Sequence, residues 1–204
     1  MALASCSNCG NTTEVNIPRS INTALDTEIK TRVRDGSLFI WECPYCGRRG
    51  VAVTETLYHD PSARLMIWLL PGTAEPSPEA QAAVEGLEGY TLRVVREVGE
   101  LIEKVNIVDA GLEDTVVEMC KWVTKRELGV RNEAAASARL KFLHTDGPDH
   151  DLVFAFPLDG NMQVVNVGFN VYEDARGIIS RNPAVRPSEG FSEVNSEWLE
   201  KFFQ

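Results

Sequence analysis

The pattern of apolar and polar positions predicts a β-rich first part of the chain. Apolar and polar residues alternate in short runs, which favours strands buried on one face, and one continuous apolar run favours a strand buried on both. These runs are TEVNIPRSI (13–21), SLFIWE (37–42), VAVTETLYHD (51–60) and the continuous ARLMIWLLP (63–71). Between the first two, DTEIKTRVRDG (26–36) favours a short helix that ends at Gly36.

Helical spacing and strand alternation both occur further along. After a strand-like TLRVVR (91–96), two amphipathic helices are expected, the second from about Glu113 to Leu128 with Gly129 as its C-cap. Four β-rich runs follow: ARLKFLH (138–144), DLVFAFP (151–157), MQVVNVGFNVY (162–172) and GIIS (177–180). Asp159-Gly160 predicts an antiparallel hairpin between the second and third runs. The tail SEWLEKFFQ predicts a helix from Ser196 whose apolar stripe packs either on the chain's own sheet, which we prefer, or on a partner chain.

These elements predict an α+β fold in two parts. Residues 1–72 form a β module, and residues 90–204 form an α+β domain with a helix pair, an antiparallel β-sheet and a C-terminal helix. Residues 73–89 are rich in Pro, Gly, Ser and Ala, so we expect a linker there, with a short helix begun by Ser77 and Pro78.

Four of the five cysteines form two Cys-x-x-Cys-Gly knuckles, CSNCG (6–10) and CPYCG (43–47). The glycine after each second cysteine allows the positive φ that such a tight turn needs. Four thiolates complete the tetrahedral coordination of Zn²⁺ and leave no open position, so Cys6, Cys9, Cys43 and Cys46 predict a structural zinc site. The 33 residues between the pairs exceed the usual spacing, which indicates a zinc-ribbon-like module with an insertion.

Two other chemistries use the same cysteines. CPYC is also the active-site tetrad of glutaredoxins, but a redox dithiol needs a helix N-terminus to lower the pKa of its first cysteine, and GRRGVAVTETL after Cys46 favours a strand. Iron in a rubredoxin-like site would use the same four thiolates. We prefer a metal site to a redox dithiol, and zinc to iron.

Other polar residues are best explained by structure. Cys120 lies on the apolar face of a predicted helix, so it is expected to pack in the core. His59 and Asp60 lie at a predicted Asp-Pro turn, where a hairpin role is preferred to chemistry. The loop HTDGPDHD from His144 to Asp151 could hold a second metal, but an acidic turn explains it without a ligand. We therefore predict no catalytic residues.

The charge distribution limits the expected partners. The chain has a net charge of −10, and residues 1–72 carry seven basic and seven acidic side chains, so all of the excess acid follows them. A chain without a basic stripe is not expected to bind nucleic acid in general. The longest apolar run, LMIWLL, is too short to cross a bilayer, and no secretory signal is visible. We expect a cytoplasmic protein without a membrane anchor, whose partners are another protein or a second copy of itself.

The order of motifs resembles the CpXC-motif family of bacterial and archaeal proteins over residues 5–125. The resemblance is carried by the two cysteine pairs, DGSLFIWECPYCG, LYHDPSARLMIWLLP and LRVVREVGELIEKVNIVDAGLEDTVVEMCKW. It implies that Cys6, Cys9, Cys43 and Cys46 hold zinc, and it implies no particular activity. The first pair, Cys-Ser-Asn-Cys, lacks the proline of the family motif, and residues beyond about 130 receive nothing from the resemblance.

Three functions are compatible with these features. The preferred one is a non-catalytic zinc-binding protein that acts as an interaction or adaptor protein. The second is an enzyme with a cleft between its two parts and zinc only as a structural ion. The third is a thiol redox sensor that releases zinc when the two Cys-x-x-Cys pairs are oxidised.

Overall fold

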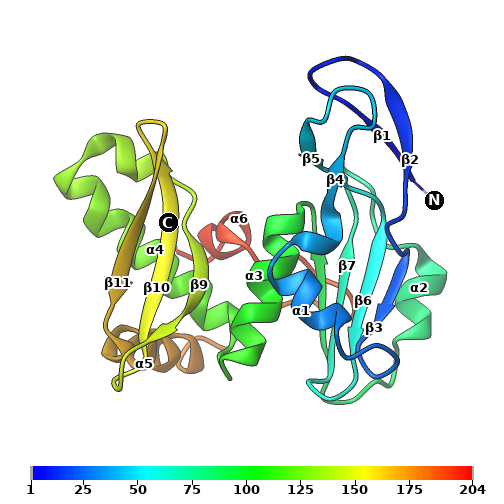
Figure 1. Ribbon diagram of the computed structural model, residues 1–204. Helices are drawn as coiled ribbons and strands as arrows, with labels where there is room; N and C mark the ends of the chain where they lie inside the picture. Colours follow the sequence, from blue (N-terminus) through cyan, green and yellow to red (C-terminus); the bar gives the residue numbers. More distant parts are fainter. Residues whose placement is uncertain (1, 204) are drawn as a thin grey trace. The chain divides into compact units, whose positions relative to one another are not determined.

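The computed structural model describes residues 2–203, which fold into two units (Figure 1). Unit 1 runs to Ile102 and includes Glu189–Ser192, and unit 2 contains Glu103–Ser188 and the residues from Glu193 onward. Each unit combines helices with strands, which confirms the predicted α+β class.

Two short antiparallel hairpins carry the cysteine knuckles of unit 1. Strands β1 (Ala2–Ser5) and β2 (Thr12–Val15) flank the first knuckle, and β4 (Ile40–Glu42) and β5 (Arg49–Val51) flank the second. Figure 1 shows the two hairpins close together in the blue N-terminal part of the chain. This is the zinc-ribbon-like arrangement that the cysteine spacing predicts.

The insertion between the knuckles joins this ribbon to a larger sheet. It contributes β3 (Ser20–Asn22), α1 (Ile29–Arg34) and a 3₁₀ turn at Ser37–Phe39. Strand β3 pairs in parallel with β6 (Thr56–Asp60). Val33 and Phe39 of the insertion are buried, so this segment is part of the hydrophobic core of unit 1 rather than a loose loop.

The sheet of unit 1 is mixed, with strand order β3-β6-β7-β8. Strand β7 (Leu65–Leu69) is antiparallel to β6, whereas β8 (Thr91–Val95) is parallel to β7. A parallel pair requires a crossover connection, and the segment after β7 supplies it with α2 (Pro78–Ala83), which Ser77 caps through a bond from Ala80 N–H. The segment at 73–89 thus connects two strands of one sheet, and the first unit continues beyond it to Ile102.

Unit 2 places helices against a three-stranded antiparallel sheet with order β11-β10-β9. Helix α3 (Val98–Asp109) begins in unit 1 and continues into unit 2. The remaining elements are α4 (Asp114–Arg131), a 3₁₀ turn at Glu133–Ser137, β9 (Lys141–Asp146), β10 (Asp151–Leu158), β11 (Asn161–Val167), α5 (Phe169–Ser180) and α6 (Ser196–Glu200). Trp198 and Leu199 of α6 are buried in the core of this unit, where α6 contacts α4. None of the described helices combines the length and apolarity needed to span a bilayer.

The segment from Gly168 to Ser180 corrects a sequence prediction. The sequence pattern predicts a third β-run that reaches Tyr172 and another strand at 177–180. Residues 169–180 instead form helix α5. Tyr172 and Ala175 are buried at helical spacing, and the rings of Phe169 and Tyr172 stack with centroids 5.2 Å apart. Burial of this helical face therefore overrides the β propensity of the individual residues.

Gly129 corrects a second prediction. It does not cap α4, because the helix continues to Arg131 and its C-cap is Asn132. A Cβ at Gly129 would lie only 2.9 Å from the Cβ of Ala136, closer than real Cβ contacts. The glycine is thus suited to the close approach of the following 3₁₀ turn.

A buried ionic network joins α3 to α4 in unit 2. Lys104 lies 3.0 Å from Asp114 and 3.5 Å from Glu118, and Lys121 lies 3.1 Å from Glu103 and 2.9 Å from Glu118. Burial raises the pKa of Glu118, although both lysines oppose the shift. Since unpaired buried charges are very costly, this network fixes how the two helices pair within the unit.

Asp60 ends β6 and is buried beside Lys30 of α1. Its carboxylate lies 2.8 Å from Lys30 Nζ and accepts hydrogen bonds from the hydroxyl and N–H of Ser62 and from Ala63 N–H. Burial alone would raise the pKa of Asp60, but the bonds from Lys30, Ser62 and Ala63 outweigh it and lower the pKa to about 2. The Asp-Pro turn therefore has a structural role, as the sequence indicates.

Replacing Asp60 should reveal this stabilisation. Because the folded-state pKa is depressed, the carboxylate stabilises unit 1 fully above about pH 4, and this contribution is lost as the pH falls toward 2. We expect Asp60→Asn to lower the free energy of unfolding by about 1–2 kcal/mol at pH 7, since Lys30 is 27% exposed and partly screened. Urea titrations followed by the NMR indole signals of Trp41 and Trp68 would measure it. Asp149→Asn in an exposed turn is the control, and a deficit that does not shrink toward pH 2 would contradict the assignment.

Candidate metal centre

The two knuckles have the same backbone geometry. In the first, Cys6 N–H donates to Asn11 O and Gly10 N–H donates to Cys6 O, both at 2.9 Å. In the second, Cys43 N–H donates to Arg48 O and Gly47 N–H donates to Cys43 O, again at 2.9 Å. Gly10 and Gly47 have φ of 72° and 71°, a conformation in which a side chain is strained. The glycines expected from the sequence thus close two equivalent turns.

The knuckles bring all four predicted cysteines together. Their sulfur atoms lie within 4.8 Å of one another, with Cys6 Sγ 3.5 Å from Cys46 Sγ and Cys9 Sγ 3.7 Å from Cys43 Sγ. All four are free thiols rather than disulfides. Zinc–sulfur bonds of about 2.3 Å would place tetrahedral thiolates about 3.8 Å apart. The donor set therefore fits a single tetrahedral metal ion.

The environment of the sulfurs differs between buried and exposed positions. Cys6 and Cys43 are buried, whereas Cys9 and Cys46 are exposed. Burial raises the pKa of Cys43 to about 11, while a hydrogen bond from Arg48 N–H, followed by one from the Asn8 side chain, lowers the pKa of Cys46 to about 6. Hydrogen bonds from the N–H groups of Cys9 and Asn8 lower the pKa of Cys6. Backbone donors directed at sulfur thus favour thiolates, the form that binds metal.

Two asparagines contact the sulfurs and were not singled out from the sequence. The Asn8 side chain hydrogen-bonds Cys46 in the other knuckle, and Asn11 Nδ2 donates to Cys9 Sγ at 3.4 Å. Asn8 lies between the two cysteines of the first pair and Asn11 follows Gly10, so an amide side chain within or next to the knuckle is the sequence signal for them. Such second partners orient ligating side chains.

The other candidate residues lie away from this centre. Cys120 is fully buried in the core of unit 2, and burial raises its pKa to about 12, which agrees with a core role. His59 lies in the β6–β7 hairpin, with Nε2 3.2 Å from the Tyr90 hydroxyl. Among residues 2–203, the four cysteines are the only group of three or more metal-ligating side chains clustered closely enough to hold an ion. The segment from His144 to Asp151 runs from the end of β9 to the start of β10.

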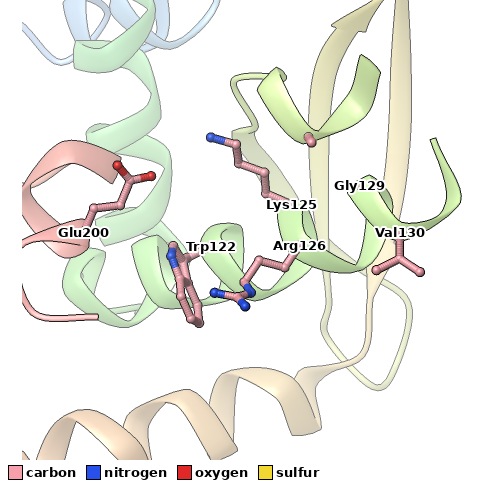
Figure 2. Close-up of a pocket in the computed structure, with 7 residues that line it drawn as sticks. Trp122, Lys125, Arg126, Gly129, Val130 and Glu200 are labelled. Carbon is pink, nitrogen blue, oxygen red and sulfur yellow. The ribbon is translucent and has the colours of Figure 1, made fainter. Parts of the chain in front are cut away.

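Unit 2 has a surface hollow of about 380 Å³ beside α4 (Figure 2). Figure 2 shows Trp122, Lys125 and Arg126 on α4 and Glu200 on α6 around it. The guanidinium of Arg126 lies over the indole of Trp122, 4.7 Å from the ring centroid. The titratable side chains that line the hollow are Lys125, Arg126 and Glu200.

Comparison with known proteins gives one match. The family model described as CpXC protein matches residues 4–121, more than half of the chain and including both knuckles. No match was found among curated proteins or among solved structures.

Glycine at position 47 should be necessary for the second knuckle. No atom lies within 4 Å of an added Cβ, so Gly47→Ala tests the positive φ alone and should destabilise unit 1 by about 1 kcal/mol. Gly177→Ala is the matched control, because this glycine lies inside α5 with room for a methyl group and alanine favours helix. Calorimetry should show opposite shifts for the two variants, and an unchanged first unit in Gly47→Ala would show that the turn tolerates a side chain.

Proposed function

The chain belongs to the CpXC protein family, and from this premise we propose that it is a zinc-binding protein in which Cys6, Cys9, Cys43 and Cys46 hold a structural ion. The ion organises the ribbon, and the protein acts without catalysis as an interaction or adaptor protein. We place it in the cytoplasm, where reducing conditions keep such thiols available for metal.

The convergence of four sulfurs is the observation that supports this proposal. With four protein ligands the tetrahedral ion has no free position for water or substrate, which is typical of structural rather than catalytic zinc. Zinc is preferred to iron because sites of this kind generally bind Zn²⁺ more tightly than Fe²⁺, although tetrahedral thiolates suit both metals.

An adaptor role is supported by apolar residues exposed on the second hairpin. Tyr45 at the knuckle tip is 65% exposed, and Ile40 and Val51, which pair across β4 and β5, are also exposed. Exposed apolar residues next to one another are common at contact sites. The acidic net charge favours a protein partner over nucleic acid.

Substitution of one ligand tests the structural role. We expect the purified chain to contain one zinc per molecule by elemental analysis and Cys43→Ser to lose it, because one missing thiolate leaves the ion open to competing ligands. NMR should then show altered indole signals for Trp41 and Trp68 of unit 1, while those of Trp122 and Trp198 of unit 2 persist.

The matched control is Cys120→Ala, which removes the one cysteine outside the centre and should retain zinc. Normal zinc content in Cys43→Ser would refute the ligand assignment. Loss of zinc without any change in the signals of unit 1 would refute the structural role.

The exposure of Cys9 and Cys46 favours a second candidate, a redox sensor that releases zinc. Peroxide would accept two electrons from the thiolates of Cys6 and Cys46, which lie 3.5 Å apart, and be reduced to water while a disulfide forms. Two ligands would then be lost and the ion released.

Stoichiometric peroxide separates the two candidates. If the protein is a sensor, one equivalent of hydrogen peroxide should release zinc to a chromogenic chelator within minutes, and peptide mapping should find a Cys6–Cys46 disulfide. Cys120→Ala should respond in the same way. Zinc that stays bound under these conditions would exclude the sensor, and the structural role would be the remaining candidate.

A further inference from the structure

Strand β11 is an open edge of the unit 2 sheet. It pairs with β10 on one side, and within residues 2–203 no strand pairs with its other side. Figure 1 shows β11 as the outer strand of the three. The backbone groups on that side are therefore available for pairing with another chain.

The turn before β11 determines which backbone groups face outward. Asp159 and Gly160 both have positive φ, and Leu158 pairs with Asn161, as in a two-residue hairpin whose flanking residues exchange hydrogen bonds. Bonded and non-bonded pairs alternate along an antiparallel ladder. Pro157, which lacks an N–H, pairs with Met162 and fits a non-bonded pair. The N–H and C=O of Met162, Val164 and Asn166 consequently point to the free edge.

The side chains of β11 lack the usual protection of an edge strand. Met162 is 66% exposed and Val164 is 59% exposed, and alternation places both on the same face of the sheet. No charged residue occurs from Gly160 to Tyr172, and β11 contains no proline. Natural edges are commonly blocked by lysine, proline or a bulge, so an unblocked apolar edge indicates an interface.

We propose that β11 pairs with β11 of a second copy of this chain, antiparallel about a twofold axis at Val164. Each copy has a net charge of −10, but β11 carries no charged side chain, so pairing of the two strands brings no like charges directly opposite one another. The strand is self-complementary about this axis, because Val164 lies opposite Val164 of the second copy and Met162 lies opposite Asn166. The two three-stranded sheets then form one continuous antiparallel sheet.

Charge placed on the axis should separate the copies. Sedimentation of the full chain, from micromolar to several hundred micromolar, should show a monomer–dimer equilibrium. Val164→Lys puts like charges directly opposite each other and should weaken dimerisation by at least about tenfold. The matched control is Val130→Lys, which makes the same change at an α4 residue that is 89% exposed, and which should dimerise as the natural chain does.

A proline variant tests the backbone pairing itself. Val164→Pro removes only an N–H that points to the free edge, so the β10–β11 ladder should survive and the dimer should not. Hydrogen exchange gives a readout within the natural chain, because the Val164 amide should become more protected as the concentration rises. Higher salt should tighten the dimer, since it screens the repulsion between acidic copies.

Several outcomes would overturn the proposal. A natural chain that remains a monomer at several hundred micromolar would exclude a self-paired edge. A dimer that is unchanged in folded Val164→Lys and Val164→Pro would place the contact elsewhere.

Discussion

Two sulfur pairs on separate hairpins meet at one point, and the first unit is arranged around that constraint. Each knuckle is closed by its own backbone hydrogen bonds and by a glycine with positive φ, so the local turns form from short-range sequence alone. Their meeting is a long-range event, because Cys9 and Cys43 are separated by residues 10–42. Closing so long a loop is entropically unfavourable, and a metal that binds only the assembled set offsets that cost.

The insertion between the two knuckles determines how the two cysteine pairs come together. Val33 and Phe39 are buried and β3 adds a parallel strand to the sheet, so the loop between the knuckles is held by packing and by pairing with β6. Lys30 and Asp60 add an ion pair between the insertion and β6. The ribbon is therefore joined to a core that does not depend on sulfur chemistry, and we expect loss of metal to affect the hairpins more than the sheet.

Some elements can be predicted from residues that are close together in the sequence, and others cannot. The knuckles, the capped α2 and the Asp159-Gly160 hairpin follow from residues a few positions apart. The parallel pairing of β7 with β8 does not, because the Pro- and Gly-rich segment between them has the composition of a linker although it connects two strands of one sheet. The β-branched and aromatic residues of α5 favour strands individually, so the helix cannot be predicted from them. Gly129 has the sequence pattern of a helix cap, because its contact with Ala136 is invisible in sequence.

Residues 189–192 belong to the first unit although almost the whole second unit precedes them in the chain. Ser192 forms a parallel bridge with Arg93, and Phe191 packs edge-on against Trp68 with ring centroids 5.4 Å apart. During synthesis the first unit therefore emerges from the ribosome with part of its apolar surface uncovered until residues 189–192 have been translated. A nascent chain that has not reached residue 189 exposes Leu70 and Leu92 without Phe191, the residue that packs with them, so this part of the core of the first unit is completed only after the strands and most helices of the second unit have been made.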